Sequence, residues 1–407
     1  MRKRDLERYA DLIVRAGLNV QPGQEVFITA SLDQPEFVAM TAEACYRAGA
    51  SRVTVDYGDQ RLTALHVKYR SPETLAELPP WEEARWQHMA DRLSCRLYLE
   101  SEDPDGLSGV DGEKMSAGMQ ARARKIKPYR DRMEDRHQWC IAAVPGAAWA
   151  KKLFPGETRA RAVEKLWNAI LDTSRARGDG VANWEAHDRD LRERCRRLNE
   201  MGISRMHYTA GNGTDLTVGM IPEAEFRGGG DTTLSGVFFN PNIPTEECFI
   251  SPKRGEAEGV VYASMPLSWS GQLIEDFWIR FEKGKAVEWG AKKNEALLGR
   301  IIGMDEGSAY LGECALVPWE SPVRQSGLLF YNTLFDENAA CHLALGRGFM
   351  DTLKDYERYT QEECRALGVN DSIAHVDFMI GTRDLSIDGI TAEGAALPVF
   401  RDGTWAF

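Results

Sequence analysis

The sequence contains no apolar run long enough to cross a membrane. No stretch approaches the roughly 18 apolar residues that a spanning helix needs. The chain starts with charged residues, Met1 to Asp5, that lead into an amphipathic pattern, where a signal peptide would have an apolar core. We therefore expect no membrane partner and a cytoplasmic location.

The sequence also lacks the cysteine spacing of a disulfide framework. Its eight cysteines are scattered and form no CxxC pair. In a chain of 407 residues they are typical of reduced intracellular thiols. Positive charge is in deficit too, since the net charge is −12. This balance argues against nucleic acid and anionic membrane surfaces as main partners.

The first part of the chain alternates between helical and strand patterns. Apolar residues recur at helical spacing from Leu6 to Ala16, and residues 25–30 form a short apolar strand pattern. A second helix near 35–48 precedes a strand at 51–56, and this β-α-β order predicts a parallel sheet. The runs 96–100 and 140–144 are expected to belong to the same layered domain.

The pattern changes near residue 190. Residues 157–201 are almost wholly helical, with one interruption at 177–180, and short strands with Gly and Asn turns follow. We place the boundary between about 185 and 200. The sequence thus predicts an α/β protein of two domains: an N-terminal α/β domain with a parallel sheet (1–190) and a mixed α+β metal-binding catalytic domain (191–407).

Side chains able to bind metal gather in the second domain. Carboxylates predominate, together with two imidazoles, a mixture that suits hydrolytic divalent ions, whereas a structural zinc site would more often use thiolates. They lie in four short segments, which are Pro244-Thr245-Glu246-Glu247, Gly312-Glu313-Cys314, Asp336 to His342, and His375-Val376-Asp377.

His375 and Asp377 lie in an apolar run that predicts a strand. Alternate residues of a strand face the same side, so the imidazole and carboxylate should converge, with Val376 and Phe378 packed behind them. The alternative is a polar pair on a solvated strand face.

The segment from Asp336 to His342 has a different pattern. Asp336 is expected to cap a helix over residues 339–345, with Glu337 in the first turn and His342 on the helix. In the alternative interpretation, Glu337 only complements the helix dipole and His342 is a buried core histidine.

Two further acidic positions complete the candidates. Glu313 has apolar neighbours, so a buried carboxylate there needs a partner, either an ion or an arginine. Glu246 and Glu247 are adjacent and should diverge, so that one binds metal while the other handles protons; a surface acidic pair is the alternative.

Together these segments resemble the dinuclear metal-dependent aminopeptidases of the M29 family, which includes aminopeptidase T, aminopeptidase S and PepS. The resemblance covers nearly the whole chain and is strongest from Asn242 to Trp405. Its motifs are Asn242-Ile243-Pro244-Thr245-Glu246-Glu247, Tyr310-Leu311-Gly312-Glu313, Leu329 to Asn338, Cys341 to Gly346, and His375 to Ile390.

The resemblance implies two divalent ions (Zn, Co or Mn) that activate water to release the N-terminal residue of a small peptide or aminoacyl amide. The charges of four carboxylates would balance two such ions. Glu246 is our candidate general base, and the family typically forms homodimers. The implied ligands are Glu247, Glu313, Glu337, His342, His375 and Asp377.

One position departs from the family. Family members generally carry a tyrosine where this chain has Phe349, which cannot donate a hydrogen bond to a developing oxyanion. A specialised hydrolase of a non-peptide amide on the same scaffold is therefore an alternative. A ring-cleaving dioxygenase of the related branch is another, although its single Fe(II) needs only about three protein ligands. A metal-stabilised binding protein without catalysis is the third.

Overall fold

The computed structural model describes residues 2–269 and 271–407. The chain divides into two compact units. Unit 1 comprises Met1–Ala186 and Gly230–Pro244, and unit 2 comprises His187–Gly229 and Thr245–Phe407. The single domain boundary at residue 190 stays a prediction.

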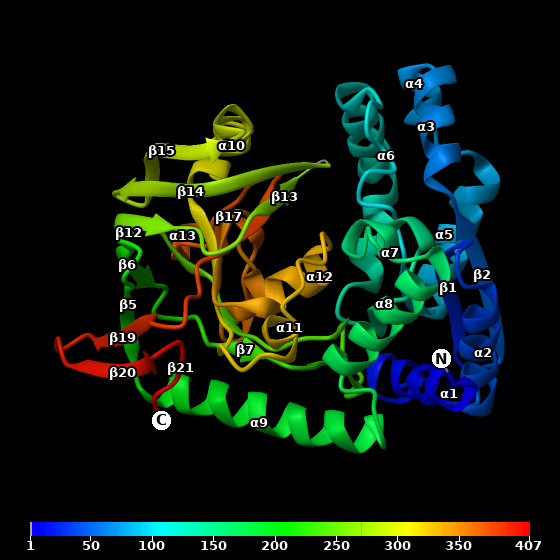
Figure 1. The fold of residues 1–407 in the computed structure, drawn as a ribbon, viewed down its shortest axis with the longest axis horizontal. Helices are drawn as coiled ribbons and strands as arrows, with labels where there is room; N and C mark the ends of the chain where they lie inside the picture. Colours follow the sequence, from blue (N-terminus) through cyan, green and yellow to red (C-terminus); the bar gives the residue numbers. More distant parts are fainter. Residues whose placement is uncertain (1, 270) are drawn as a thin grey trace. The chain divides into compact units, whose positions relative to one another are not determined.

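Unit 1 is built on a parallel sheet of five strands in the order β10-β4-β3-β1-β2. Figure 1 labels β1 and β2 of this sheet. Every neighbouring pair is parallel, as the β-α-β pattern predicts. The apolar runs form its central strands because they can be buried on both faces. The strands are β1 Glu25–Ser31, β2 Arg52–Gly58, β3 Cys95–Glu100, β4 Trp139–Ala143 and β10 Asn242–Ile243, with a separate pair, β8 Asp231–Thr232 and β9 Phe238–Phe239.

The helices of unit 1 carry aromatic core residues on their apolar faces. Tyr9 of α1 stacks on Phe37 of α2 at 5.5 Å between ring centroids, and Trp167 of α8 lies 5.2 Å from Phe37. These contacts explain why apolar residues recur at helical spacing near the start of the chain. The helices are α1 Lys3–Leu12, π-helix η1 Ile13–Gly17, α2 Pro35–Arg47, α3 Gln60–Tyr69, α4 Pro72–Leu75, α5 Pro80–Arg92, α6 Gly112–Met133, α7 Ala147–Leu153 and α8 Arg159–Thr173.

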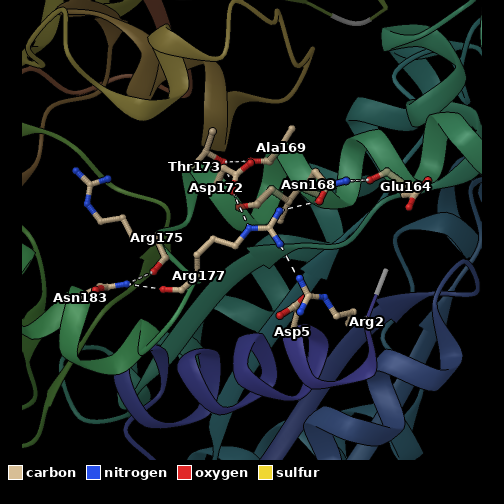
Figure 2. A network of polar contacts seen from close by, with 11 residues as sticks. Arg2, Asp5, Glu164, Asn168, Ala169, Asp172, Thr173, Arg175, Arg177 and Asn183 are labelled. Carbon is tan, nitrogen blue, oxygen red and sulfur yellow. Dashed lines mark hydrogen bonds and ion pairs between the residues drawn. The ribbon is translucent and has the colours of Figure 1, made fainter.

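A polar network fixes the turn between α8 and α9 Gly180–Glu200 (Figure 2). The Arg177 guanidinium donates to Asp172 and Asn168, both at 2.7 Å. Asn183 donates from its amide to the carbonyls of Arg175 and Arg177 at 3.0 and 2.8 Å. The predicted interruption at 177–180 is therefore a turn that these hydrogen bonds hold in place. Gly178 adopts the left-handed backbone conformation that the turn requires, with φ +72°.

Unit 2 contains two antiparallel sheets. The smaller has the order β18-β17-β16-β11-β7, and the larger runs β13-β14-β12-β6-β5-β19-β20-β21 with β15 paired to β14. Their strands are β5 Ile203–Thr209, β6 Asp215–Met220, β7 Arg227–Gly228, β11 Cys248–Ile250, β12 Pro252–Tyr262, β13 Leu267–Trp269, β14 Gln272–Glu282, β15 Lys285–Lys293, β16 Leu311–Leu316, β17 His342–Gly346, β18 His375–Met379, β19 Ser386–Thr391, β20 Ala396–Arg401 and β21 Thr404–Trp405.

Both sheets contribute to one hydrophobic core, which includes Phe277 of β14 and Phe378 of β18. The short helices of this unit are α10 Glu295–Ile302, α11 Pro322–Gln325, α12 Thr333–Asp336, α13 Gln361–Leu367 and the 3₁₀ turns η2 Gly307–Ala309, η3 Glu337–Ala339, η4 Met350–Thr352 and η5 Tyr356–Arg358. Among the described residues, no helix is both long enough and apolar enough to cross a membrane.

Candidate metal centre

The smaller sheet of unit 2 aligns candidate ligands across three strands. Asp377 of β18 pairs with Ala344 of β17, and Ala344 pairs with Glu313 of β16. Residues paired in register share a face of the sheet, as do residues two positions apart. His342 and His375 therefore lie on the same face as Glu313 and Asp377.

The opposite face of these strands belongs to the core. Val376 and Phe378 are buried there, as predicted for the residues behind His375 and Asp377. The predicted strand over this segment is confirmed as β18 His375–Met379.

Two small residues lie next to the candidate ligands. Ala344, fully buried, is the middle member of the row and extends only a methyl group between the two carboxylates. Gly312, beside Glu313, lies at a β-bulge, where an added Cβ would come within 2.3 Å of the carbonyl oxygens of Gly346 and Arg347. Neither residue was singled out from the sequence, because only the strand register shows what lies next to it.

The two histidines are held by backbone carbonyls so that their other nitrogens point at carboxylates. Nδ1 of His375 lies 2.7 Å from the carbonyl of Arg347, and Nδ1 of His342 lies 3.2 Å from that of Ala340. Since a carbonyl only accepts, each Nδ1 carries the proton and leaves Nε2 for a metal or a second proton.

Around these Nε2 atoms the carboxylates form two groups. His342 Nε2 lies 3.3 Å from Oε2 of Glu247, which precedes β11. His375 Nε2 lies 3.1 Å from Glu313 and 3.2 Å from Asp377. Potential ligand atoms within 4.8 Å of one another thus define the groups Glu247-Glu313-His342 and Glu313-His375-Asp377. Glu313 belongs to both.

Glu337, the remaining predicted ligand, lies beside these groups. It begins the 3₁₀ turn η3, and burial, then the charges of Glu247 and Asp377, raise its pKa well above the ordinary value. The structure therefore brings five predicted ligands into the two groups and places the sixth within their electrostatic reach.

The helix predicted over residues 339–345 is wrong. Residues 342–346 form strand β17, paired with β16 on one side and β18 on the other. A short apolar run buried on both faces has the same composition in a strand and in a buried helix, and pairing with distant strands decided between them.

Asp336 is not the cap of that helix either. It ends α12, and its carboxylate accepts hydrogen bonds from the N–H groups of Phe330 at 2.7 Å and Asn332 at 3.1 Å. Burial raises its pKa to about 7, although these bonds oppose the shift.

The titration of the cluster fits cation binding. Burial lowers the pKa of His342 and His375, but the facing carboxylates outweigh burial and raise these pKa values to about 10 and about 11. Burial, with Glu247 and Asp377 nearby, raises the pKa of Glu313 to about 7.

Metal is the natural partner for such a cluster. Asp377 Oδ1 is buried and lies 3.2 Å from Nε2 of His375, and within residues 2–269 and 271–407 no Lys or Arg forms an ion pair with the six candidate ligands. Oxygen-rich donors with two imidazoles suit a divalent ion, which would replace the protons that now hold these groups together.

Glu246 lies outside both groups. It is only 4 % exposed, and its carboxylate lies 3.9 Å from Nε2 of His187, a residue the sequence did not single out. Its N–H donates to Oδ1 of Asn338 at 2.7 Å. The two adjacent acids therefore have different surroundings, as we expected from their positions.

Phe349 packs directly on a candidate ligand. Its ring centroid is 4.9 Å from that of His375, and Phe249 closes on it edge-to-face at 5.6 Å. The ring thus supports the imidazole and offers no hydrogen-bond donor there.

Comparison with known proteins gives matches over the whole chain. A family model described as thermophilic metalloprotease (M29) matches residues 2–405. Aminopeptidase AmpS of Bacillus subtilis (strain 168) is 40% identical over 404 residues, which are 99% of this chain and 98% of that protein. Aminopeptidase T of Thermus thermophilus is 41% identical over 405 residues, with the same shares covered.

A solved structure, wild-type AmpT from Thermus thermophilus, is similar throughout. It superposes with a TM-score of 0.91 at 40% sequence identity and covers 100% of both chains.

Proposed function

The chain belongs to the M29 family of thermophilic metalloproteases and is a metallo-aminopeptidase, and from that premise we propose that it uses two divalent ions to hydrolyse the N-terminal residue of small peptides or aminoacyl amides. The observation that carries the two-ion proposal is the place of Glu313 in both ligand groups. A carboxylate has two oxygens, so Glu313 can serve one ion with each.

Six residues would hold the ions. Glu247 and His342 would bind one side, His375 and Asp377 the other, with Glu313 between them and Glu337 completing the set. Carboxylate and imidazole ligands of this kind are compatible with zinc, cobalt or manganese.

Bound divalent ions would supply Lewis acidity that lowers the pKa of water and polarises the scissile carbonyl. The protein's own part is to position and to move protons. Glu246 is our general base, which takes a proton at its carboxylate and passes it to the leaving amine. Its burial and its position next to Glu247 in the chain support this role. A free α-amine on the substrate would bind a metal ion or a spare carboxylate, which would restrict cleavage to the chain end.

Metal analysis with an activity assay tests the proposal. We expect two ions per chain and hydrolysis of aminoacyl nitroanilides by metal-loaded protein. One iron per chain with no hydrolysis would favour the ring-cleaving dioxygenase, and metal without any turnover would favour a binding protein.

Replacing Glu246 by Gln tests the general base. We expect turnover to fall by about 10²–10⁴-fold because proton transfer is lost while the shape of the side chain is kept. Metal content should stay at the wild-type value. Near-normal turnover in this variant would eliminate Glu246 as the base.

Phe349 favours one alternative, a hydrolase specialised for a non-peptide amide, because the donor that family members generally carry is replaced by a ring that packs on His375. Rates on peptides and aminoacyl amides, measured side by side with rates on amides that contain no amino-acid residue, separate the two.

The setting of the enzyme is also part of the proposal. We propose that residues 191–407 form the catalytic domain and residues 1–190 the N-terminal domain of a cytoplasmic homodimer. The family resemblance supports the dimer, and the reduced-thiol pattern supports the location. Mass measurement in solution tests the dimer.

A further inference from the structure

A pocket opens beside the candidate metal centre within unit 2. Two predicted ligands, His375 and Asp377, form one wall. Strand β13 contributes Leu267 and Trp269, and the segment before Glu337 contributes residues 331–333 and Asp336. The pocket encloses about 470 Å³ of empty space, a volume that includes open solvent.

The position of this pocket matches the needs of an aminopeptidase. The carbonyl that is attacked must lie at the ligands, and the β-carbon of the N-terminal residue is only two bonds from that carbonyl carbon. A pocket walled by His375 and Asp377 is therefore within reach of that side chain.

The chemistry of the walls selects among side chains. Pro266, Leu267, Trp269 and Met379 give apolar surface, and no Lys or Arg lines the pocket among the described residues. An acidic side chain would face the carboxylates of Asp336 and Asp377 without a cation to pair with.

A basic side chain gains little from the same acids. Both oxygens of Asp336 already accept backbone N–H groups, from Phe330 and from Asn332. Asp377 is committed to His375 and to the proposed ions. Neither carboxylate is available as a partner for an ammonium or guanidinium group, so an uncharged side chain fits best.

Trp269 is suited to bind such a side chain. It is half-buried and packs on the core of the unit, so its ring is supported from behind while part of its surface stays accessible. A supported aromatic ring gives a large contact area at a small cost in side-chain entropy.

We propose that this pocket binds the side chain of the substrate's N-terminal residue, that it selects bulky uncharged side chains such as those of phenylalanine and leucine, and that Trp269 determines this specificity. The inference rests on the proposed aminopeptidase function and adds the substrate class to it.

Replacing Trp269 by Ala tests the pocket in two measurements. The first compares kcat/KM for phenylalanine, leucine and alanine nitroanilides on metal-loaded enzyme. The second measures by calorimetry the affinity of the reaction products L-phenylalanine and L-alanine, which needs no turnover. In both we expect the preference for phenylalanine over alanine to fall at least about tenfold, because lost apolar contacts in a pocket are worth about 10–200-fold.

Two further variants serve as controls. Trp269→Phe keeps an aromatic wall and should retain an intermediate preference. Trp81→Ala removes a tryptophan that is 69% exposed and lies in α5, outside the pocket, and should leave both preferences unchanged. Metal content and the melting temperature of each variant show whether the fold and the centre persist.

The outcomes separate the two proposals. An unchanged preference in Trp269→Ala, or a wild-type protein that does not discriminate phenylalanine from alanine, overturns the pocket assignment while hydrolysis would still support the aminopeptidase. Binding of phenylalanine through Trp269 without hydrolysis of any nitroanilide would support the pocket and refute the proposed reaction. The absence of both binding and hydrolysis would refute both.

Discussion

Metal binding to this protein should release protons, and the number follows from the geometry of the two histidines. Each Nδ1 donates to a backbone carbonyl, and each Nε2 lies 3.1–3.3 Å from a carboxylate oxygen. An unprotonated Nε2 and a carboxylate oxygen are both acceptors. Without a metal, they stay at this distance only if Nε2 carries a proton. The raised pKa values of about 10 for His342 and about 11 for His375 express this.

A divalent ion needs the lone pair on each Nε2 and the charge on each carboxylate. At about pH 8 full loading should therefore displace one proton from each imidazole, or about two per chain. Glu313, with a pKa of about 7, is mostly ionised at that pH and adds about one more proton near pH 6.

Calorimetric titration of metal-free protein with zinc, repeated in buffers of different ionisation enthalpy, gives the proton count as a slope. Release of less than about one proton per chain from the wild type would refute the reasoning. It would mean that the imidazoles already present free lone pairs.

Three further predictions concern residues around the ligands. Ala344→Val should abolish binding of at least one ion although every ligand remains, because the larger side chain enters the row between Glu313 and Asp377, at an overpacking cost of about 1–3 kcal/mol. Ala374→Val, at a core residue directly before β18, should cost similar stability yet keep both ions by metal analysis. Asn338→Ala should remove the hydrogen bond from the N–H of Glu246 and the one to the Leu334 carbonyl, which should destabilise the fold by about 1–3 kcal/mol. At about 2–4 °C per kcal/mol a thermal melt should show this loss. An unchanged melting temperature and turnover would show that this link is dispensable. Asp305→Asn should destabilise the segment that leads into His375, because burial raises the Asp305 pKa but hydrogen bonds from Ile373 N–H and Ser308 outweigh this and lower it to about 2. A carboxyl with a depressed pKa contributes stability above its ordinary pKa of 3.8 and loses it as the pH falls through about 2. The difference in the free energy of unfolding between variant and wild type, measured by chemical denaturation, should therefore disappear across that pH window. A difference that persisted below about pH 2 would count against the assignment.

Local patterns in the sequence were enough for much of the fold. The alternation around His375 and Asp377 predicts a strand with two polar residues on one face, and β18 confirms it, because side-chain alternation is a property of the strand itself. The parallel sheet of unit 1 likewise follows from the order of apolar strands and helices, since parallel strands need a crossover between them.

His342 shows where local patterns fail. The apolar residues after it fit a buried helix as well as a buried strand, and the strand is selected by hydrogen bonds to β16 and β18, which lie elsewhere in the sequence. Local patterns do not indicate the role of Asn338 either, because its side-chain oxygen accepts a hydrogen bond from the N–H of Glu246, which is 92 residues away in the sequence.

The sequence by itself determined which side chains can bind metal, that they are carboxylates and imidazoles, and which family they belong to, because these depend on residue type and order. Only the tertiary structure decided that Ala344 leaves the space between Glu313 and Asp377, that backbone carbonyls turn both Nε2 atoms toward the carboxylates, and that Trp269 stands beside them. Those features depend on strand register and on contacts between distant segments, which are set when the chain packs its core.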